Sequence, residues 1–260
     1  MLIEFSLWLG VLGLMLGSFA NVCVHRIPRG QSIVFPGSHC PNCDHAIALY
    51  DNIPLLSWLV LRGKCRHCNT AIAWRYPLME LVMGLCWAGL ALHYGIRAEL
   101  IVALVLFFLL WVLSVIDLET YLLPNALTYP GIVLGLLFSY WLGGLAAGQA
   151  ALIGAMAGYA VFWLVARIFL WLTSREGMGG GDFKLLAMLG AFMGWQALPF
   201  IILASSVVGS VVGLAFLIMA RRGIRTEIPF GPYLAMAGMI WFVWGSAILA
   251  WYIQFAGFQA

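Results

Sequence analysis

Long apolar runs separated by short polar stretches occupy most of the chain. A helix that crosses a bilayer needs about 20 mainly apolar residues, whereas the strands of a membrane barrel alternate apolar and polar positions over about ten residues. The runs are continuous, so they predict helices. Eight segments qualify as candidate spans, near Phe5–Val24, Leu78–Leu92, Leu100–Ile116, Pro130–Ala147, Ala150–Leu172, Phe183–Trp195, Leu198–Ala220 and Tyr233–Trp251. The sixth is short and is compatible with a re-entrant or half-length helix buried among its neighbours.

Composition then fixes the class of protein. The residues AVILMFWYC make up 64% of the 260-residue chain, and charged residues only 9%, against about 25% charged residues in a soluble domain. This leaves too little polar surface for a soluble enzyme, a disordered chain or a secreted disulfide scaffold. We therefore expect an all-α polytopic membrane protein. Its expected parts are a first transmembrane helix at residues 1–24, a polar loop domain at 25–77 and a helical bundle at 78–260.

The positions of the basic residues predict the orientation of the bundle. With eight spans and the N-terminus outside, segments 25–77, 117–129, 173–182 and 221–232 face the cytoplasm. Twelve of the 13 Lys and Arg residues lie in these segments or in adjoining helix ends, and only Arg97 lies outside. Basic residues favour the cytoplasmic side of a membrane. The only charged side chain before Arg26 is Glu4, so no basic signal-peptide region is apparent and we expect the first helix to be retained.

Residues 25–77 contain two CxxC pairs, which are typical of a zinc ribbon. The four cysteines are Cys40, Cys43, Cys65 and Cys68. Four thiolates form a closed tetrahedral site that has no open coordination position, so its role would be structural. The alternative is two disulfides, but a loop that faces the reducing cytoplasm argues against them. The sequence therefore predicts a small zinc-ribbon-like domain between the first and second spans.

Two aspartates stand where predicted spans meet the cytoplasm. Asp117 directly follows Leu100–Ile116, and Asp182 directly precedes Phe183–Trp195. The topology puts both carboxylates at the same depth, where ionisable groups usually mark function. Two close carboxylates share one proton, so one can activate water while the other protonates a leaving amine. The pair thus indicates aspartic-protease chemistry, although each aspartate taken alone could be an interfacial helix cap.

The residues around Asp182 add to this hypothesis. Gly179 and Gly181 would let a neighbouring backbone or an extended substrate approach closely. Asp182 would also stand at a helix N-terminus, where the helix dipole favours its ionised form.

Taken together, the motifs resemble the bacterial type IV prepilin peptidases, which are leader peptidases and N-methyltransferases of type IV pilus and type II secretion systems. The resemblance extends over essentially the whole chain. The matching residues are Gly17–Val22 with His25, Arg26 and Pro28, the two CxxC pairs, Arg75–Glu80, Asp117–Glu119 with Leu123 and Pro124, Gly179–Leu185, and Pro229–Ala235.

The resemblance implies a function and roles for residues. Asp117 and Asp182 would be the catalytic dyad, with Gly179, Gly181, Lys184 and Glu80 in the active-site loop or substrate site. The substrate would be a prepilin or pseudopilin, cut after Gly between a short basic leader and an apolar helix in the lipid bilayer. S-adenosylmethionine would then methylate the new N-terminus. The sequence has no strand–GxGxxG–helix unit, which excludes a Rossmann-type methyltransferase, and we expect no nucleic-acid partner.

Two other interpretations differ in class. A polytopic transporter or channel with a structural zinc-binding loop would place its acids near mid-membrane and show repeat symmetry between its halves. Here the acids stand at helix ends and no halves repeat. A zinc-ribbon membrane scaffold without catalysis would leave Asp117 and Asp182 unexplained.

Overall fold

The computed structural model describes residues 1–175, 177–220 and 229–255, and every regular element in these ranges is a helix. The all-α prediction is confirmed. The elements are α1 (Leu2–Arg26), η1 (Ile27–Arg29), η2 (Leu49–Asn52), α2 (Leu56–Val60), α3 (Arg75–Tyr94), α4 (Ala98–Thr120), α5 (Asn125–Thr173), α6 (Gly180–Met193), η3 (Trp195–Ala197), α7 (Leu198–Ala220) and α8 (Gly231–Phe255). The chain forms two compact units, Met1–Val112 and Leu113–Ala260, which divide within α4.

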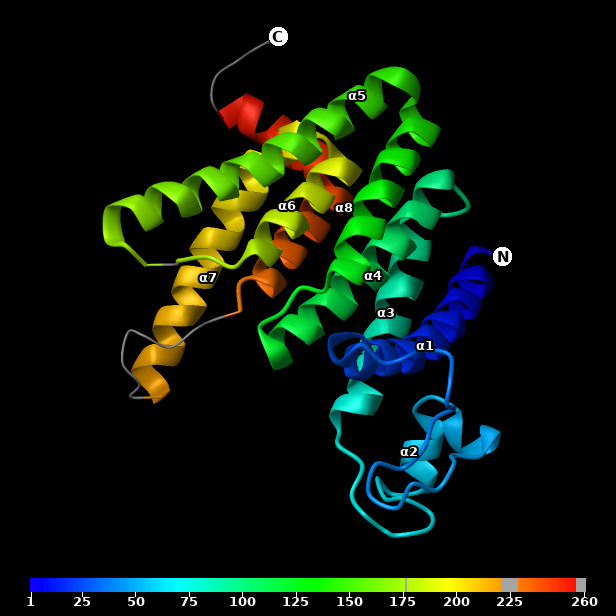
Figure 1. Ribbon diagram of the computed structural model, residues 1–260. Coiled ribbons are helices and arrows are strands. Elements are labelled where there is room, and N and C mark those ends of the chain that lie inside the picture. The colour runs from blue at the N-terminus through cyan, green and yellow to red at the C-terminus, as the bar shows by residue number, and fades with distance from the viewer. Residues whose placement is uncertain (176, 221–228, 256–260) are drawn as a thin grey trace. The chain divides into compact units, whose positions relative to one another are not determined.

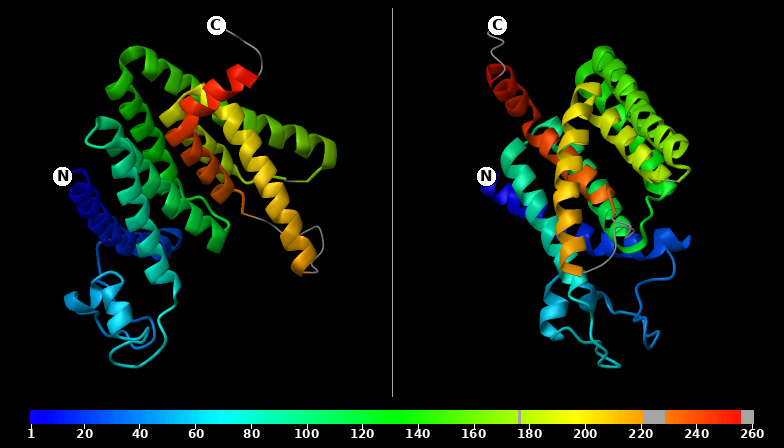
Figure 2. Two further views of the ribbon diagram at one scale, coloured as in Figure 1. Left: turned by 180° about the vertical axis from the view of Figure 1, so that it is seen from behind. Right: turned by 90° about the vertical axis from the view of Figure 1, so that its left-hand side faces the viewer.

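Six helices in the described ranges are long and apolar enough to cross a membrane, namely α1, α3, α4, α5, α7 and α8. Helix α5 has 49 residues, but Gly144 interrupts it with a φ of 65°. Figures 1 and 2 show that α5 changes direction sharply between its two arms, residues 125–143 and 145–173. Glycine tolerates this conformation because it lacks a Cβ. The two arms correspond to the predicted spans Pro130–Ala147 and Ala150–Leu172.

Helix α6 is the sixth apolar segment. Its 14 residues span roughly 21 Å at 1.5 Å per residue, less than a hydrocarbon core of about 30 Å. Residues 185–192 are all buried, so the helix is surrounded by protein instead of lipid. An apolar helix with no exposed face is typical of a buried core element, which makes α6 a half-length helix inside the second unit.

The two arms of α5 enclose α6 (Figure 1). On the first arm, Ser139 Oγ donates a hydrogen bond of 2.9 Å to the Ala191 carbonyl. On the second arm, Gly154 lies so close to Gly190 that a Cβ on either would overlap the backbone of the other. These backbone contacts hold α6 in place and thereby fix the position of its first turn.

In the first unit, α1 packs along α3 through small residues. A Cβ added to Gly17 would lie 2.6 Å from the Glu80 Cα, and one added to Gly13 would lie 2.9 Å from the Met83 carbonyl oxygen. Small residues at helix interfaces allow close backbone approach inside membranes. The polar loop between these two helices carries the four cysteines of the CxxC pairs.

One predicted cytoplasmic segment cannot be compared with the structure. Arg221, Arg222 and Arg225, which belong to the predicted cytoplasmic segment 221–232, lie outside the described residues. The division into residues 1–24, 25–77 and 78–260 stays a prediction.

Candidate active site and metal centre

Asp117 lies in the last turn of α4 and is held by the start of α8. Its side chain is only 5% exposed. Its Oδ2 accepts a hydrogen bond of 2.9 Å from the backbone N–H of Gly231, a residue 114 positions away. A carboxylate makes such a bond more strongly than a neutral acid does. Sequence reasoning did not find this contact, although Gly231 lies in the motif Pro229–Ala235.

Two glycines leave space for the side chains of Asp117 and Leu123. A Cβ on Gly231 would lie 2.7 Å from Asp117 Oδ2 and 3.3 Å from Leu123 Cδ2. A Cβ on Gly181 would lie 2.8 Å from Leu123 Cβ. The Leu123 side chain therefore lies against both glycines, and it packs the turn after α4 against the starts of α6 and α8. No sequence signal marked Leu123 beyond its place in the motif.

Asp182 lies in the first turn of α6, outside the six span helices, and its side chain is half-buried. Burial and, as the smaller cause, the nearby charge of Asp117 together raise the pKa of Asp182 to about 7. The ionised form expected from the helix N-terminus is thus outweighed by desolvation and by repulsion between like charges. Asp117 and Asp182 belong to the same compact unit, and the charge of Asp117 acts on Asp182. That the two carboxyl groups share one proton stays a prediction.

The four cysteines of the polar loop form one cluster. The Sγ atoms of Cys40, Cys43, Cys65 and Cys68 all lie within 4.8 Å of one another, and none is in a disulfide. The Cys40 and Cys68 sulfurs are 3.7 Å apart. Four sulfurs about 2.3 Å from one tetrahedral ion would be about 3.8 Å apart. The donor set and its spacing therefore fit a metal ion that prefers thiolates.

Both CxxC pairs have the same local geometry. Cys40 N–H donates to the His45 carbonyl and Asp44 N–H to the Cys40 carbonyl, and in the second pair Cys65 N–H donates to Thr70 and Asn69 N–H to Cys65. Asp44 and Asn69 both have positive φ values, 53° and 56°, a conformation that Asp and Asn tolerate better than most residues. Each pair thus forms a knuckle that points its sulfurs at the other.

Hydrogen bonding also prepares one of these thiols for a metal. The Thr70 hydroxyl lies 3.4 Å from Cys68 Sγ. Hydrogen bonds of Thr70 and Asn42 lower the pKa of Cys68, which favours its thiolate. Metal ions bind the thiolate form.

Comparison with known proteins places this chain in a family. Residues 11–94 match the bacterial peptidase A24 N-terminal domain, and residues 104–214 match the type IV leader peptidase family. The chain is 45% identical to a protein of Stutzerimonas stutzeri that is named prepilin leader peptidase/N-methyltransferase, over 95% of this chain and 93% of the relative. The chain belongs to the type IV leader peptidase family. Two more relatives with that name, from Aeromonas hydrophila and Pseudomonas aeruginosa, are 44% and 43% identical over 92% and 96% of this chain, and over 91% and 93% of their own lengths. No solved structure matches the chain.

Lys184 lies in the same motif as Asp182, Gly179–Leu185, and it connects α6 to α5. Its Nζ donates a 2.6 Å hydrogen bond to Asn125 Oδ1 and lies 5.5 Å from the centroid of the Tyr129 ring. A cation in the first turn of a helix is opposed by the helix dipole, so these contacts compensate for its position. Sequence reasoning selected Lys184 but not its partner Asn125. A role of Lys184 or of Gly179 in substrate binding stays a prediction.

Glu80 lies in the first unit, on α3, and is only 8% exposed. Its Oε2 accepts a 2.8 Å hydrogen bond from the Leu55 N–H, and Ser18 contributes a second hydrogen bond. Leu55 has a positive φ of 60° immediately before α2. In this leader-peptidase chain Glu80 therefore anchors the cysteine loop to α1 and α3, and its place in a substrate site stays a prediction.

Proposed function

We propose that this protein is a membrane-embedded aspartic endopeptidase that removes the basic leader from prepilins or pseudopilins. It cuts after Gly at the cytoplasmic membrane surface and then methylates the new N-terminus with S-adenosylmethionine. The observation that carries the proposal is the identity of 43–45% to prepilin leader peptidase/N-methyltransferases over more than 90% of the chain. The alternative transporter interpretation has no comparable support.

Asp117 and Asp182 divide the chemistry of hydrolysis between them. Asp117, which accepts the Gly231 N–H, is the carboxylate that removes a proton from the attacking water. Asp182 is the acid that donates a proton to the leaving amine, because its pKa of about 7 leaves about half of it protonated at neutral pH and most of it protonated below. One proton enters the pair from water as another leaves it with the amine, so the dyad needs no metal or covalent intermediate.

The membrane topology fits this substrate. Twelve of the 13 basic residues lie on one predicted side, which we assign to the cytoplasm of a bacterial inner membrane, with the N-terminus outside. The dyad then lies at the cytoplasmic edge of the bilayer. A prepilin could rest its apolar helix among the lipids while its leader stays in water, with the bond to be cut between the two.

We propose zinc as the occupant of the cysteine cluster. It would be held by Cys40, Cys43, Cys65 and Cys68 and would stabilise the loop, because four protein ligands leave no position for a substrate.

Cleavage and methylation are tested together on a purified prepilin. The protein in detergent micelles should release the leader, and label from methyl-tritiated S-adenosylmethionine should appear on the shortened pilin alone. Label without cleavage, or neither product, would overturn the proposal, and cleavage without label would remove the methyltransferase half of it.

The pH dependence of cleavage should follow the protonation of Asp182. Because the pKa of Asp182 is raised to about 7, the proton-sharing form of the dyad is lost as the pH rises through that value. We expect kcat/KM to fall about tenfold per pH unit above about pH 7 to 8. A rate that stays constant from pH 6 to 9 would show that Asp182 does not supply the proton.

A methyl group on Gly231 should impair the dyad. Gly231→Ala would place a Cβ 2.7 Å from Asp117 Oδ2 and displace the carboxylate. A shift of about 1 Å costs up to roughly 100-fold in rate, so we expect a 10- to 100-fold loss of kcat. Gly89→Ala, where nothing lies within 4 Å of the new Cβ, is the matched control. Equal rates for the two variants would contradict the proposed geometry.

A further inference from the structure

The cysteine loop carries a contiguous apolar surface that the peptidase chemistry does not use. We call it the α2 patch. It consists of residues of η2, of α2 and of the turn between them, with exposed fractions of 91% for Leu49, 65% for Tyr50, 47% for Ile53, 59% for Leu56, 62% for Leu59 and 75% for Val60. The two short helices contact each other. Exposed apolar residues that are scattered singly are ordinary, but a contiguous group marks an interaction site.

The opposite side of α2 is fixed to the loop, so the patch cannot turn inward. The Trp58 Nε1 donates a 3.2 Å hydrogen bond to the Ile72 carbonyl, and its ring covers Gly63, whose added Cβ would lie 3.0 Å from it. Ser57 Oγ donates to the Tyr50 carbonyl at 3.0 Å and accepts the Ile53 N–H at 3.1 Å. Leu56, Leu59 and Val60 have the i, i+3, i+4 spacing of one helix face, and that face is exposed.

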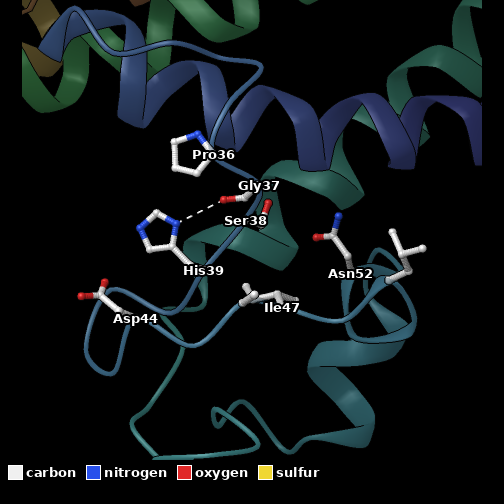
Figure 3. A pocket seen from close by; sticks show the side chains of 9 residues that line it. Pro36, Gly37, Ser38, His39, Asp44, Ile47 and Asn52 are labelled. Atoms are coloured by element: carbon white, nitrogen blue, oxygen red, sulfur yellow. Dashed lines mark hydrogen bonds between the residues drawn. The ribbon is translucent and has the colours of Figure 1, made fainter.

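A shallow hollow adjoins the patch. It has a volume of about 630 Å³ and shares Leu49 with the patch. Figure 3 shows its labelled side chains, among them Pro36, Ile47 and Asn52, and the hydrogen bond from His39 to the Gly37 carbonyl. Past η2 the surface of the loop therefore has both apolar side chains, such as Pro36 and Ile47, and polar ones, such as Asp44.

The charge of the cysteine loop indicates which kind of partner the α2 patch binds. Residues 25–77 contain six Lys and Arg against two Asp, a formal charge of +4 with neutral His, which four thiolates on one divalent ion would reduce to +2. Arg62 and Lys64 follow α2 directly, and both are exposed. Apolar side chains flanked by basic ones suit an anionic lipid surface. A basic leader peptide or a second copy of this basic loop would be repelled.

The connections of the loop bring it to the membrane. It leaves α1 after Arg26 and enters α3 at Arg75, and both helices are candidate spans. We infer that the α2 patch rests on the anionic phospholipid surface of the bilayer that α1 and α3 cross, with Leu56, Leu59 and Val60 among the acyl chains and Arg62 and Lys64 at the phosphates. This surface contact does not depend on the peptidase dyad.

Photocrosslinking in the intact protein tests the contact. Leu59 is replaced by p-benzoylphenylalanine, and the full chain is placed singly in nanodiscs of phosphatidylethanolamine with 30% phosphatidylglycerol. The matched control carries the same label at Asn42, an exposed polar residue of the first knuckle. After irradiation, intact-mass spectrometry should show at least fivefold more lipid adduct at position 59 than at position 42. Replacing all lipid by phosphatidylcholine should reduce the adduct at position 59 at least twofold.

Other outcomes would overturn the inference. Equal lipid adducts at positions 59 and 42 would show that the patch is not in the bilayer. A crosslinked dimer in vesicles that hold several copies, or a crosslink to added prepilin in place of lipid, would assign the patch to a protein partner. Circular dichroism of each labelled protein verifies the fold, and a label at Leu56 must reproduce the result at Leu59.

Discussion

Asp117→Asn is expected to lower the rate of prepilin cleavage by at least about 10³-fold. The amide has nearly the shape of the carboxylate, and its Oδ1 can still accept the Gly231 N–H that Asp117 binds at 2.9 Å. The fold should therefore persist. The amide cannot remove a proton from water, however, and general base catalysis contributes typically 10² to 10⁴-fold. Asp182→Asn should cause a loss of similar size because the leaving amine then has no proton donor.

The control for these variants lies on the same helix as Asp117. Glu99→Gln changes an exposed acid in the first turn of α4 and should cleave at the wild-type rate. Single-turnover assays with excess enzyme measure the chemical step separately from product release. Cleavage by either Asn variant at a rate within tenfold of wild type would contradict the assignment of the dyad.

Cys40→Ser is expected to abolish metal binding and to unfold the loop at residues 25–77. Structural zinc contributes about 10 to 16 kcal/mol to the folding of small zinc domains. The other contacts that hold the described residues of the loop are individually much weaker, namely two isolated β-bridges, His39 with Ala46 and Lys64 with Ala71, and single hydrogen bonds such as that from Leu55 N–H to Glu80. Wild-type protein should contain one zinc per chain by mass spectrometry of the metal, and the variant none.

Trypsin provides the structural measure of this effect. Arg62 and Lys64 are exposed in the folded loop, and we expect cleavage beside them to accelerate at least tenfold in Cys40→Ser. Cys86→Ser, on α3 and outside the cluster, should keep both its zinc and the wild-type digestion rate. A Cys40→Ser protein that retained its zinc would contradict a four-cysteine site.

Much of the fold could be predicted from local sequence. The apolar runs predict all eight segments because each is a continuous stretch that lipid or protein must cover. The reversal within α5 follows from Gly144, whose φ of 65° other residues rarely adopt. The half-length helix α6 was recognisable from its short run, but its burial between the two arms of α5 depends on contacts such as that of Gly154 with Gly190, which sequence alone does not reveal.

The site was predictable in its residue types but not in its connections. Asp117 and Asp182 stand out because both are acids that directly adjoin apolar runs on the same predicted side of the membrane. The hydrogen bond from Gly231 joins residues 114 positions apart, and the contacts of Leu123 with two glycines are set by helix packing. No local sequence pattern encodes this hydrogen bond or these contacts of Leu123. The position of Asp182 at a helix N-terminus would lower its pKa, but burial raises it, and the effect of burial is the larger of the two.

The central claim is that Asp117 and Asp182 act as one proton-sharing pair, and a carboxyl titration tests it most directly. The chain has four aspartates, so ¹³C labelling of Asp carboxyl groups gives few infrared bands, and Asp182→Asn identifies the band of Asp182. In wild-type protein that band should titrate near pH 7, because the pKa of Asp182 is raised to about 7. In Asp117→Asn its midpoint should move to lower pH, since the repelling charge is gone. An Asp182 midpoint that is the same in both proteins would contradict the pair.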